Sequence, residues 1–177
     1  MGLNRIKIGL MAKTAALLAL ICCTGCQPSR PDHPEPRVLF AGLSFSLPAQ
    51  PKVIAMPNGR GDFLVFKYSN QRGKDYLAFS QEAVLDNSCS SEAFFQAVVN
   101  PAAHSLCNAQ AVRVFTQQFA DQYPAELWPS AKHNAYYFQS NDQRRFVFIP
   151  LAADQLLKID SDFFSKQQLR DLVGYSD

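Results

Sequence analysis

The sequence contains none of the short motifs that mark common catalytic or cofactor-binding sites. A P-loop, a glycine-rich dinucleotide fingerprint, an HExxH zinc motif and a nucleophile elbow are all missing. Histidine is scarce as well, with three residues in 177, and a zinc site needs three or four protein ligands. These absences predict a protein without a cofactor, a bound metal or catalytic residues, and therefore not an enzyme.

Long hydrophobic runs and a strong net charge are also missing. The apolar run from Ala15 to Cys23 has nine residues, about half of what a membrane-spanning helix needs. The 17 basic residues of the chain nearly balance its 15 acidic ones, and no stripe of Lys and Arg is interleaved with aromatic residues. A permanent transmembrane helix and nucleic-acid binding are therefore not expected.

The N-terminus has the anatomy of an export signal, because basic residues precede the short apolar run. The next residues, Cys23-Thr24-Gly25-Cys26, resemble the lipobox of bacterial lipoproteins, in which small residues precede a required cysteine. Cys23 departs from that pattern, since the first position is usually Leu. The resemblance implies that residues 1–25 are removed as a signal peptide and that Cys26 is acylated on its thiol and on its new amino group.

The residue after the modified cysteine bears on where the protein is sorted. By analogy with enteric lipoproteins, Gln27 in place of Asp favours the periplasmic face of the outer membrane. Three acyl chains exceed what stable anchoring requires, so the membrane is an expected partner. An ordinary secreted cysteine behind a conventional cleavage site is the alternative. Residues 26–37 hold the lipidated cysteine and a proline-rich tether, and residues 38–177 are predicted to form a single globular domain.

Two cysteines remain in the domain once those of the signal are removed and Cys26 is acylated. An even pair in an oxidising compartment predicts a disulfide between Cys89 and Cys107. Three other interpretations stay open: a pair of inert thiols, a catalytic thiol, and metal ligation by Cys107 together with His104.

Hydrophobic periodicity predicts two helices among several strands. Apolar residues at helical spacing predict a helix from Ser91 to Val99, and a capping box formed by Ser165 and Gln168 begins a second helix at the C-terminus. Alternating or aromatic-rich segments predict strands at 43–47, 52–56, 63–68, 76–80, 111–119, 135–139, 144–149 and 156–163. The expected fold is α+β, with a mainly antiparallel sheet and a middle helix and a C-terminal helix packed on it.

The domain opens with the strand Leu43-Ser44-Phe45-Ser46-Leu47-Pro48 and continues with the aromatic hairpin 63–80 and the helix from Ser91. It ends in a strand and a helix that runs through Val173. This order resembles the PsbP-like family of small α/β sandwiches, although the cysteine pair is not part of the family's pattern. The resemblance implies an accessory or binding subunit, and it carries no catalytic residue over to this chain.

The connection from Asp121 to Asn134 has no clear periodicity, and long connections of this kind are usually functional or disordered. Its prolines and the single tryptophan argue against disorder, so Trp128, Lys132 and His133 are candidate partner-binding residues. The alternative is that Trp128 packs under the loop as part of the core.

Two pairs of like charges elsewhere are expected to lie at the surface. Asp160 and Asp162 could suggest an acid and a base, but on a strand they would share one solvated face. Arg144 and Arg145 follow each other into a strand and would point to opposite faces, as surface charges rather than as an anion clamp.

Together with the export signal, these features predict a non-catalytic envelope lipoprotein that binds a protein partner. It would serve as an accessory subunit of a membrane-associated assembly or as an immunity-type protein that sequesters a toxin in the periplasm. A small periplasmic hydrolase with an unrecognised site and a tether to the cell wall are the alternatives from other functional classes.

Overall fold

The computed structural model describes residues 35–57, 59, 61–102, 106–130, 132–152 and 155–174. The chain divides into residues 1–34 and a compact unit that begins at Glu35. The predictions for the signal peptide, for Cys26 and for the tether up to Pro34 therefore lie outside the described residues, and so does His104.

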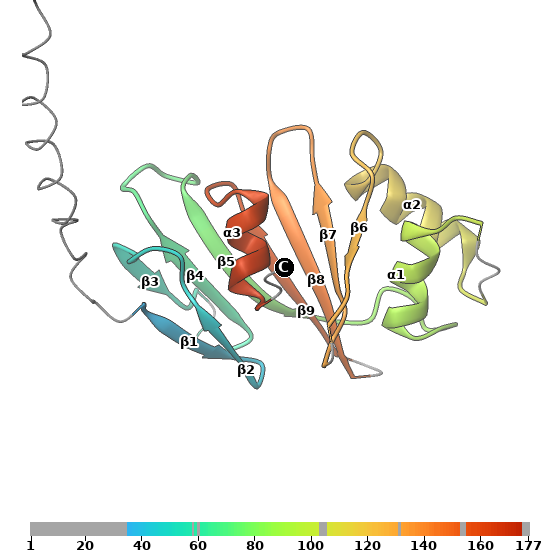
Figure 1. The fold of residues 1–177 in the computed structure, drawn as a ribbon, viewed down its shortest axis with the longest axis horizontal. Helices are drawn as coiled ribbons and strands as arrows, with labels where there is room; N and C mark the ends of the chain where they lie inside the picture. The colour runs from blue at the N-terminus through green and yellow to red at the C-terminus, as the bar shows by residue number, and fades with distance from the viewer. Residues whose placement is uncertain are drawn as a thin grey trace, which may run out of the picture. The chain divides into compact units, whose positions relative to one another are not determined.

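Within these ranges the chain forms nine strands and three helices (Figure 1). The strands are β1 (Arg37–Phe40), β2 (Leu43–Ser46), β3 (Val53–Ala55), β4 (Phe63–Lys67), β5 (Tyr76–Glu82), β6 (Glu126–Trp128), β7 (Ala135–Gln139), β8 (Arg145–Ala152) and β9 (Gln155–Ser161). The helices are α1 (Ser91–Val99), α2 (Ala109–Phe119) and α3 (Lys166–Leu172). The described strand pairs are antiparallel, so the predicted α+β fold with a mainly antiparallel sheet is confirmed. No described helix combines the length and the hydropathy that crossing a membrane requires.

Seven of the strands form one sheet in the order β3-β4-β5-β9-β8-β7-β6, so β9 is its central strand. The strands β5 and β8 flank β9, and Ala78 of β5 and Phe146 of β8 lie on either side of Asp160. The last strand of the chain therefore joins two halves of the sheet that come from separate parts of the sequence.

The hairpin of β1 and β2 forms a second, two-stranded sheet. Sequence periodicity does not predict β1, since the first expected strand begins at Leu43. The two strands are joined by Ala41 and Gly42, whose φ angles of 51° and 78° belong to a tight type I′ turn. Because Ala is not a residue that usually signals such a turn, the sequence carries only a weak hint of this hairpin.

Residues 109–119 form helix α2, so the strand predicted at 111–119 is wrong. Val112, Val114 and Thr116 place β-branched side chains at every second position, a pattern that is typical of a strand. The alternating β-branched side chains therefore predict the wrong element here, because burial does not alternate between successive residues of this segment.

The start of α2 and its aromatic residues explain why this segment is helical. The Asn108 side chain caps the helix, since its oxygen accepts hydrogen bonds from the first-turn N–H groups of Gln110 and Ala111 at 2.9 and 3.2 Å. Phe115 and Phe119 are one helical turn apart, and their ring centres lie 4.6 Å from each other. Both rings pack on the sheet. On a strand, residues four apart would lie about 13 Å from each other, too far for their rings to touch.

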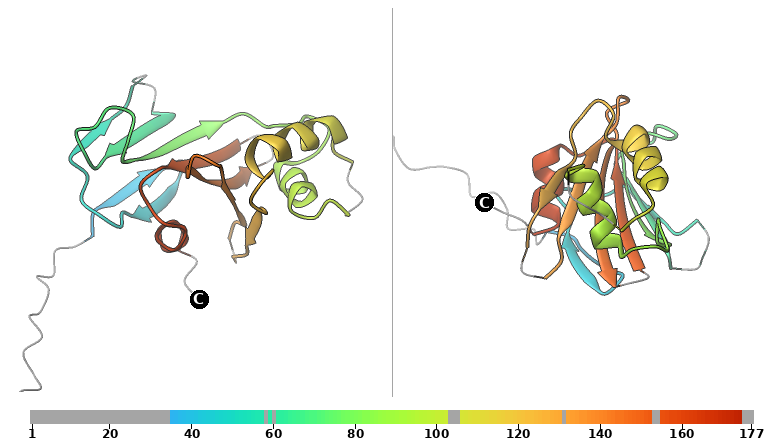
Figure 2. Two further views of the ribbon diagram at one scale, coloured as in Figure 1. Left: turned by 90° about the horizontal axis from the view of Figure 1, so that it is seen from above. Right: turned by 90° about the vertical axis from the view of Figure 1, so that its right-hand side faces the viewer.

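The large sheet buries apolar side chains on both faces, because successive strand residues point to opposite sides. On one face, the β1–β2 hairpin and α3 cover a cluster that includes Phe79, Trp128 and Ile159. On the other face, α1 and α2 cover an aromatic cluster that includes Phe95 and Phe148. Figure 2 shows α3 and the other two helices on opposite sides of the sheet.

Both predicted helices are confirmed, and α1 has the predicted bounds. At the start of α3, the Ser165 hydroxyl accepts from the Gln168 N–H, while the Gln168 side chain accepts from the Ser165 N–H at 3.0 Å. Phe164 and Leu169, the hydrophobic pair at this helix start, are both buried. Gly174, with φ of 77°, adopts the left-handed conformation that ends many helices.

Candidate functional site

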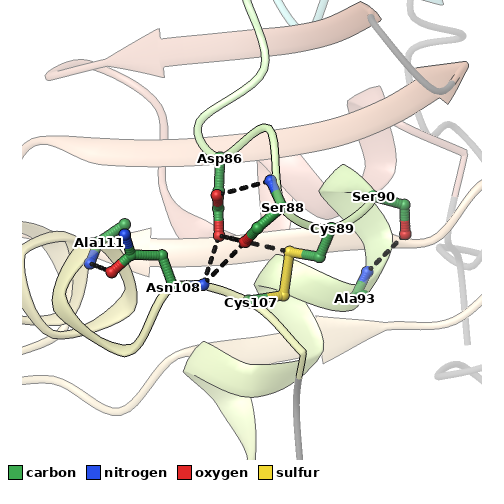
Figure 3. The surroundings of a disulfide bond; sticks show 8 residues. All are labelled: Asp86, Ser88, Cys89, Ser90, Ala93, Cys107, Asn108 and Ala111. Carbon is green, nitrogen blue, oxygen red and sulfur yellow. Dashed lines mark hydrogen bonds between the residues drawn. A yellow bond between two sulfur atoms is a disulfide. The ribbon is translucent and has the colours of Figure 1, made fainter.

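The disulfide joins the starts of the two neighbouring helices. The sulfurs of Cys89 and Cys107 are 2.04 Å apart, which confirms the predicted bridge. Each cysteine directly precedes the N-cap residue of a helix, Ser90 for α1 and Asn108 for α2 (Figure 3). The bridge therefore fixes the two helix N-termini together, and the interpretations as inert or catalytic thiols do not apply to two sulfurs that are bonded to each other.

Asp86 lies where the bridge meets the start of α2. Its carboxylate accepts hydrogen bonds from the Ser88 hydroxyl at 2.7 Å and from the Asn108 backbone N–H at 2.6 Å. Hydrogen bonds from the Ser88 side chain and backbone and from the Asn108 backbone lower the pKa of Asp86. Since α2 has no acidic residue in its first turn, Asp86 supplies the negative charge that a helix N-terminus favours.

Among the described residues, Asp86, Cys89 and Cys107 come together as a group of possible metal ligands. One candidate ligand atom from each residue lies within 4.8 Å of the other two. A metal would need the cysteines as thiolates, whereas both sulfurs are consumed by the disulfide. We therefore interpret the group as a helix-capping cluster and not as a metal centre.

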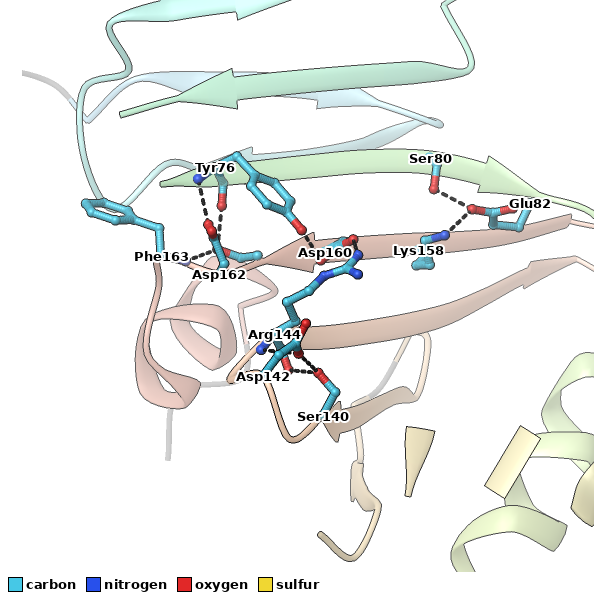
Figure 4. Close-up of polar contacts among 11 residues, drawn as sticks. Tyr76, Ser80, Glu82, Ser140, Asp142, Arg144, Lys158, Asp160, Asp162 and Phe163 are labelled. Carbon is cyan, nitrogen blue, oxygen red and sulfur yellow. Dashed lines mark hydrogen bonds and ion pairs between the residues drawn. The ribbon is translucent and has the colours of Figure 1, made fainter. Parts of the chain in front are cut away.

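A second polar cluster is centred on Asp160 of the central strand β9 (Figure 4). The Asp160 side chain is 12% exposed; its carboxylate accepts a hydrogen bond from the Tyr76 hydroxyl at 3.0 Å and pairs with the Arg144 guanidinium at 2.5 Å. Burial and the Asp160 charge raise the pKa of Tyr76, so its phenol stays a neutral donor. Burial alone would lower the pKa of Arg144, but the hydrogen bond and charge of Asp160 outweigh it and raise that pKa. The three side chains thus hold one another in fixed positions.

Lys158 of β9 forms a neighbouring cluster with β5. Its ammonium lies 2.6 Å from Glu82 Oε1, and the Ser80 hydroxyl donates to the same oxygen at 2.7 Å. Burial would raise the pKa of Glu82, but the hydrogen bonds from Lys158 and Ser80 and the charge of Lys158 outweigh it and lower that pKa. The carboxylate is therefore ionised at neutral pH and accepts from two donors at once.

These contacts correct the expectation that the two aspartates lie on a solvated edge. Asp160 is buried in the middle of the sheet. Asp162 lies just beyond the end of β9, and its carboxylate accepts a hydrogen bond from the backbone N–H of Tyr76 at 2.9 Å. Arg144 and Arg145 point to opposite faces of the sheet, as expected. Arg144 reaches Asp160 on one face, whereas Arg145 donates a hydrogen bond to the Phe164 carbonyl at 3.1 Å on the other face.

Both clusters lie on the half of the sheet that α1 and α2 leave uncovered. The register places Ala78, Asp160 and Phe146 in one row across β5, β9 and β8. Phe146 packs against Phe119 of α2, whereas Ala78 and Asp160 line a cavity of about 540 Å³. A second cavity of about 510 Å³ lies between α2 and the β7–β8 turn and shares Lys158 with the first. We call these two cavities the charged groove.

The charged groove carries charges of both signs in fixed positions. Two of its cations are each paired with a carboxylate, Arg144 with Asp160 and Lys158 with Glu82. Side chains that already hold one another lose little conformational freedom when a partner binds. An arrangement of alternating charges suits a polar protein surface better than it suits a single anion or cation.

The three predicted partner-binding residues do not share one environment. Trp128 on β6 is 2% exposed and stacks on Tyr137 with ring centres 4.9 Å apart, so it belongs to the core, as the alternative interpretation had it. Lys132 is exposed and His133 is partly buried in the loop that follows β6. Both border a cavity of about 360 Å³ beside α1 and another of about 370 Å³ beside β2. Binding through Lys132 and His133 stays a prediction.

The charged groove is not predicted by the sequence, although part of its signal is present there. Lys158 and Asp160 of β9 alternate with apolar residues, and Ser80 and Glu82 of β5 lie two residues apart and therefore share a face. Their pairing depends on β5 lying beside β9, which alternation within one strand does not specify. Only the register brings the four side chains together.

The functional interpretation of the charged groove depends on its own geometry. Comparisons of the chain with protein-family models, with curated proteins and with solved structures find no match.

Proposed function

We propose that this chain is a lipid-anchored lipoprotein of the bacterial envelope whose domain binds a protein partner. It acts as an accessory subunit of a membrane-associated assembly or as an immunity-type protein that holds a toxin inactive in the periplasm. The lipobox-like sequence that ends at Cys26 supports the anchor, and the resemblance to PsbP-like proteins supports an accessory role. The bond between Cys89 and Cys107 supports an oxidising compartment, where disulfides persist.

The observation that carries the binding role is the charged groove on the central strand. Phe146 and Phe148 of β8 lie beneath the helices, and they pair across the sheet with Asp160 and Lys158 of β9. Charged residues therefore occupy the β9 positions that would have to be apolar if the helices covered this strand as well. The sequence therefore keeps this half of the face open and polar.

The fixed charges of the groove favour a partner of complementary charge pattern. A protein whose surface alternates acidic and basic groups would be steered towards the groove and held in one register. Arg144 and Lys158 would meet carboxylates of the partner, and Asp160 and Glu82 would meet its cations. An immunity-type protein and an accessory subunit differ in the identity of this partner and not in the surface that they use.

A photocrosslinking amino acid at Gln118 tests the proposal in living cells. Gln118 on α2 is exposed and lines the charged groove. Gln167, exposed on α3 on the opposite side of the sheet, is the matched control position. We expect a discrete protein adduct from position 118 and none from position 167. Mass spectrometry of the adduct then distinguishes a toxin from an assembly subunit.

The variant Lys158→Gln provides the second arm of this experiment. It removes a cation of the groove, but the ion pair with Glu82 is partly exposed, so the thermal midpoint should fall only slightly. We expect the adduct from Gln118 to weaken in this background. Equal adducts from Gln118 and Gln167, or an adduct that Lys158→Gln leaves unchanged, would show that the groove is not the binding surface.

A further inference from the structure

Strand β3 gives the domain an apolar edge. Val53, Ile54 and Met56 are 51%, 61% and 60% exposed. Val53 and Ile54 are neighbours on a strand and therefore point to opposite faces of the sheet. Both are exposed because β3 is the terminal strand and pairs with β4 alone among the described strands. Apolar side chains are thus presented on both faces and along the rim of the sheet.

Basic residues cluster at the Val53 end of this apolar edge. Four of them lie beside β3, on β4 or in the loop between β4 and β5: Lys52, Lys67, Arg72 and Lys74. The Lys52 N–H donates to the Lys67 carbonyl at 2.7 Å, which holds the first two at the start of β3. In the described part of β4 and the turns on either side of it, the acidic residues are Asp62 and Asp75. Positive charge therefore predominates at this end of the edge.

The chain enters the domain at the same end as β3. The first described residue is Glu35, and the Pro36 carbonyl accepts from the Leu47 N–H at 2.7 Å, which fixes the entry point to the β1–β2 hairpin. Figures 1 and 2 show β1 and β3 together at the end of the domain that lies away from α1 and α2. Eight residues lie between Cys26 and Glu35, so even a fully extended chain spans at most about 32 Å between the Cα atoms of these two residues.

We propose that the β3 edge, formed by Val53, Ile54 and Met56, lies on the lipid surface in which the anchor is inserted. This inference rests on the lipid anchor of the proposed function. The exposed apolar side chains enter the boundary between headgroups and acyl chains, and the lysines and arginine at the Val53 end of the edge contact anionic headgroups. Because the tether is short, it keeps the edge at a high local concentration next to the membrane, and this compensates for the small area of the apolar patch. The end with α1 and α2 then points away from the membrane (Figure 1).

Fluorescence of the full-length, acylated protein in vesicles of phosphatidylethanolamine and phosphatidylglycerol tests the inference. Ile54→Trp places a reporter on the edge, and Val114→Trp, at a 49% exposed position of α2, is the matched control. The natural Trp128 is buried and contributes the same background to both. We expect the emission added by Ile54→Trp to shift to the blue and to be quenched by brominated acyl chains. The emission added by Val114→Trp should do neither.

The possible outcomes separate the docking from the anchor. If the protein sediments with the vesicles but brominated lipid does not quench the Ile54→Trp emission, the docking is wrong and the anchor stands. A blue shift that grows with the protein-to-lipid ratio, without quenching by brominated lipid, means that a second copy of the chain covers the edge and also overturns the docking. Failure to associate with vesicles contradicts the anchor and, with it, this inference. Met56→Trp is a second reporter on the same edge, and an unchanged thermal midpoint confirms that each variant is folded.

Discussion

Replacement of Trp128 by Ala should destabilise the domain strongly, because this tryptophan joins the edge strand β6 to the core. Its ring stacks on Tyr137 at an interplanar angle of 17°, and the Arg170 guanidinium lies 6.0 Å from the ring centre. Its Nε1–H donates to Glu126 at 3.3 Å. The side chain is therefore held by an aromatic neighbour, a cation and a hydrogen bond at the same time.

The expected loss follows from the buried area. A buried tryptophan removes about 200 Å² from water, which corresponds to an upper estimate of about 5 kcal/mol. Truncation of a buried aromatic residue to Ala typically costs about 3 to 5 kcal/mol. For a domain of this size, each kcal/mol changes the thermal midpoint by about 3 °C, so Trp128→Ala should lower it by about 10 to 15 °C. Trp128→Phe keeps a stacking ring and should lose much less.

Circular dichroism during thermal unfolding measures this loss, since the variants lack the only tryptophan. The emission of the unmodified protein provides an independent check, and it should be blue-shifted and poorly quenched by iodide. A red-shifted, readily quenched emission would contradict the core position. So would a Trp128→Ala midpoint that matches the midpoint of the unmodified protein.

Three further predictions concern the bridge and the charged groove. Joint replacement of Cys89 and Cys107 by Ser should lower the free energy of unfolding, measured by urea titration, by about 3 kcal/mol. Alkylation of these cysteines in the native protein before any reductant is added would contradict the bridge. Asp160→Asn leaves an arginine and a tyrosine without their charged acceptor and should cost about 1 to 3 kcal/mol; an unchanged urea midpoint argues against the cluster. The pKa of Glu82 is lowered in the folded protein from its ordinary value of 4.5, so its contribution to stability is present above pH 4.5 and is lost as the pH falls through the folded value. The stability difference between the unmodified protein and Glu82→Gln should therefore shrink from pH 7 to pH 3, and an equal difference at both values would refute this assignment.

Most of the fold can be predicted from the sequence because the core is aromatic and regularly patterned. The capping box at Ser165 identifies α3, and the aromatic segments of β4 and β5 predict their hairpin. The prediction fails where one local signal imitates another, as at Val112, Val114 and Thr116, whose β-branched alternation hides the helix α2. Helix capping and packing by neighbouring residues outweigh intrinsic strand preference at that segment.

The candidate site could not be predicted because it depends on which strands become neighbours. Whether Asp160 is solvated or buried is decided by β5 and β8 on either side of it, and nothing within β9 encodes that choice. The position of Trp128 is similar. The β6–β7 register places the small, buried Ala135 opposite it, which leaves room for its ring to stack on Tyr137. Local sequence leaves both a core and a surface position open for this residue.

The proposed role and the membrane-facing edge both depend on a lipid at Cys26. The most direct measurement is the mass of the N-terminal peptide of the protein extracted from the membranes of its native bacterium. The account predicts a peptide that begins at Cys26 and carries a diacylglyceryl group on the thiol and an acyl chain on the amino group. An unmodified Cys26 thiol in the membrane-extracted protein would contradict it.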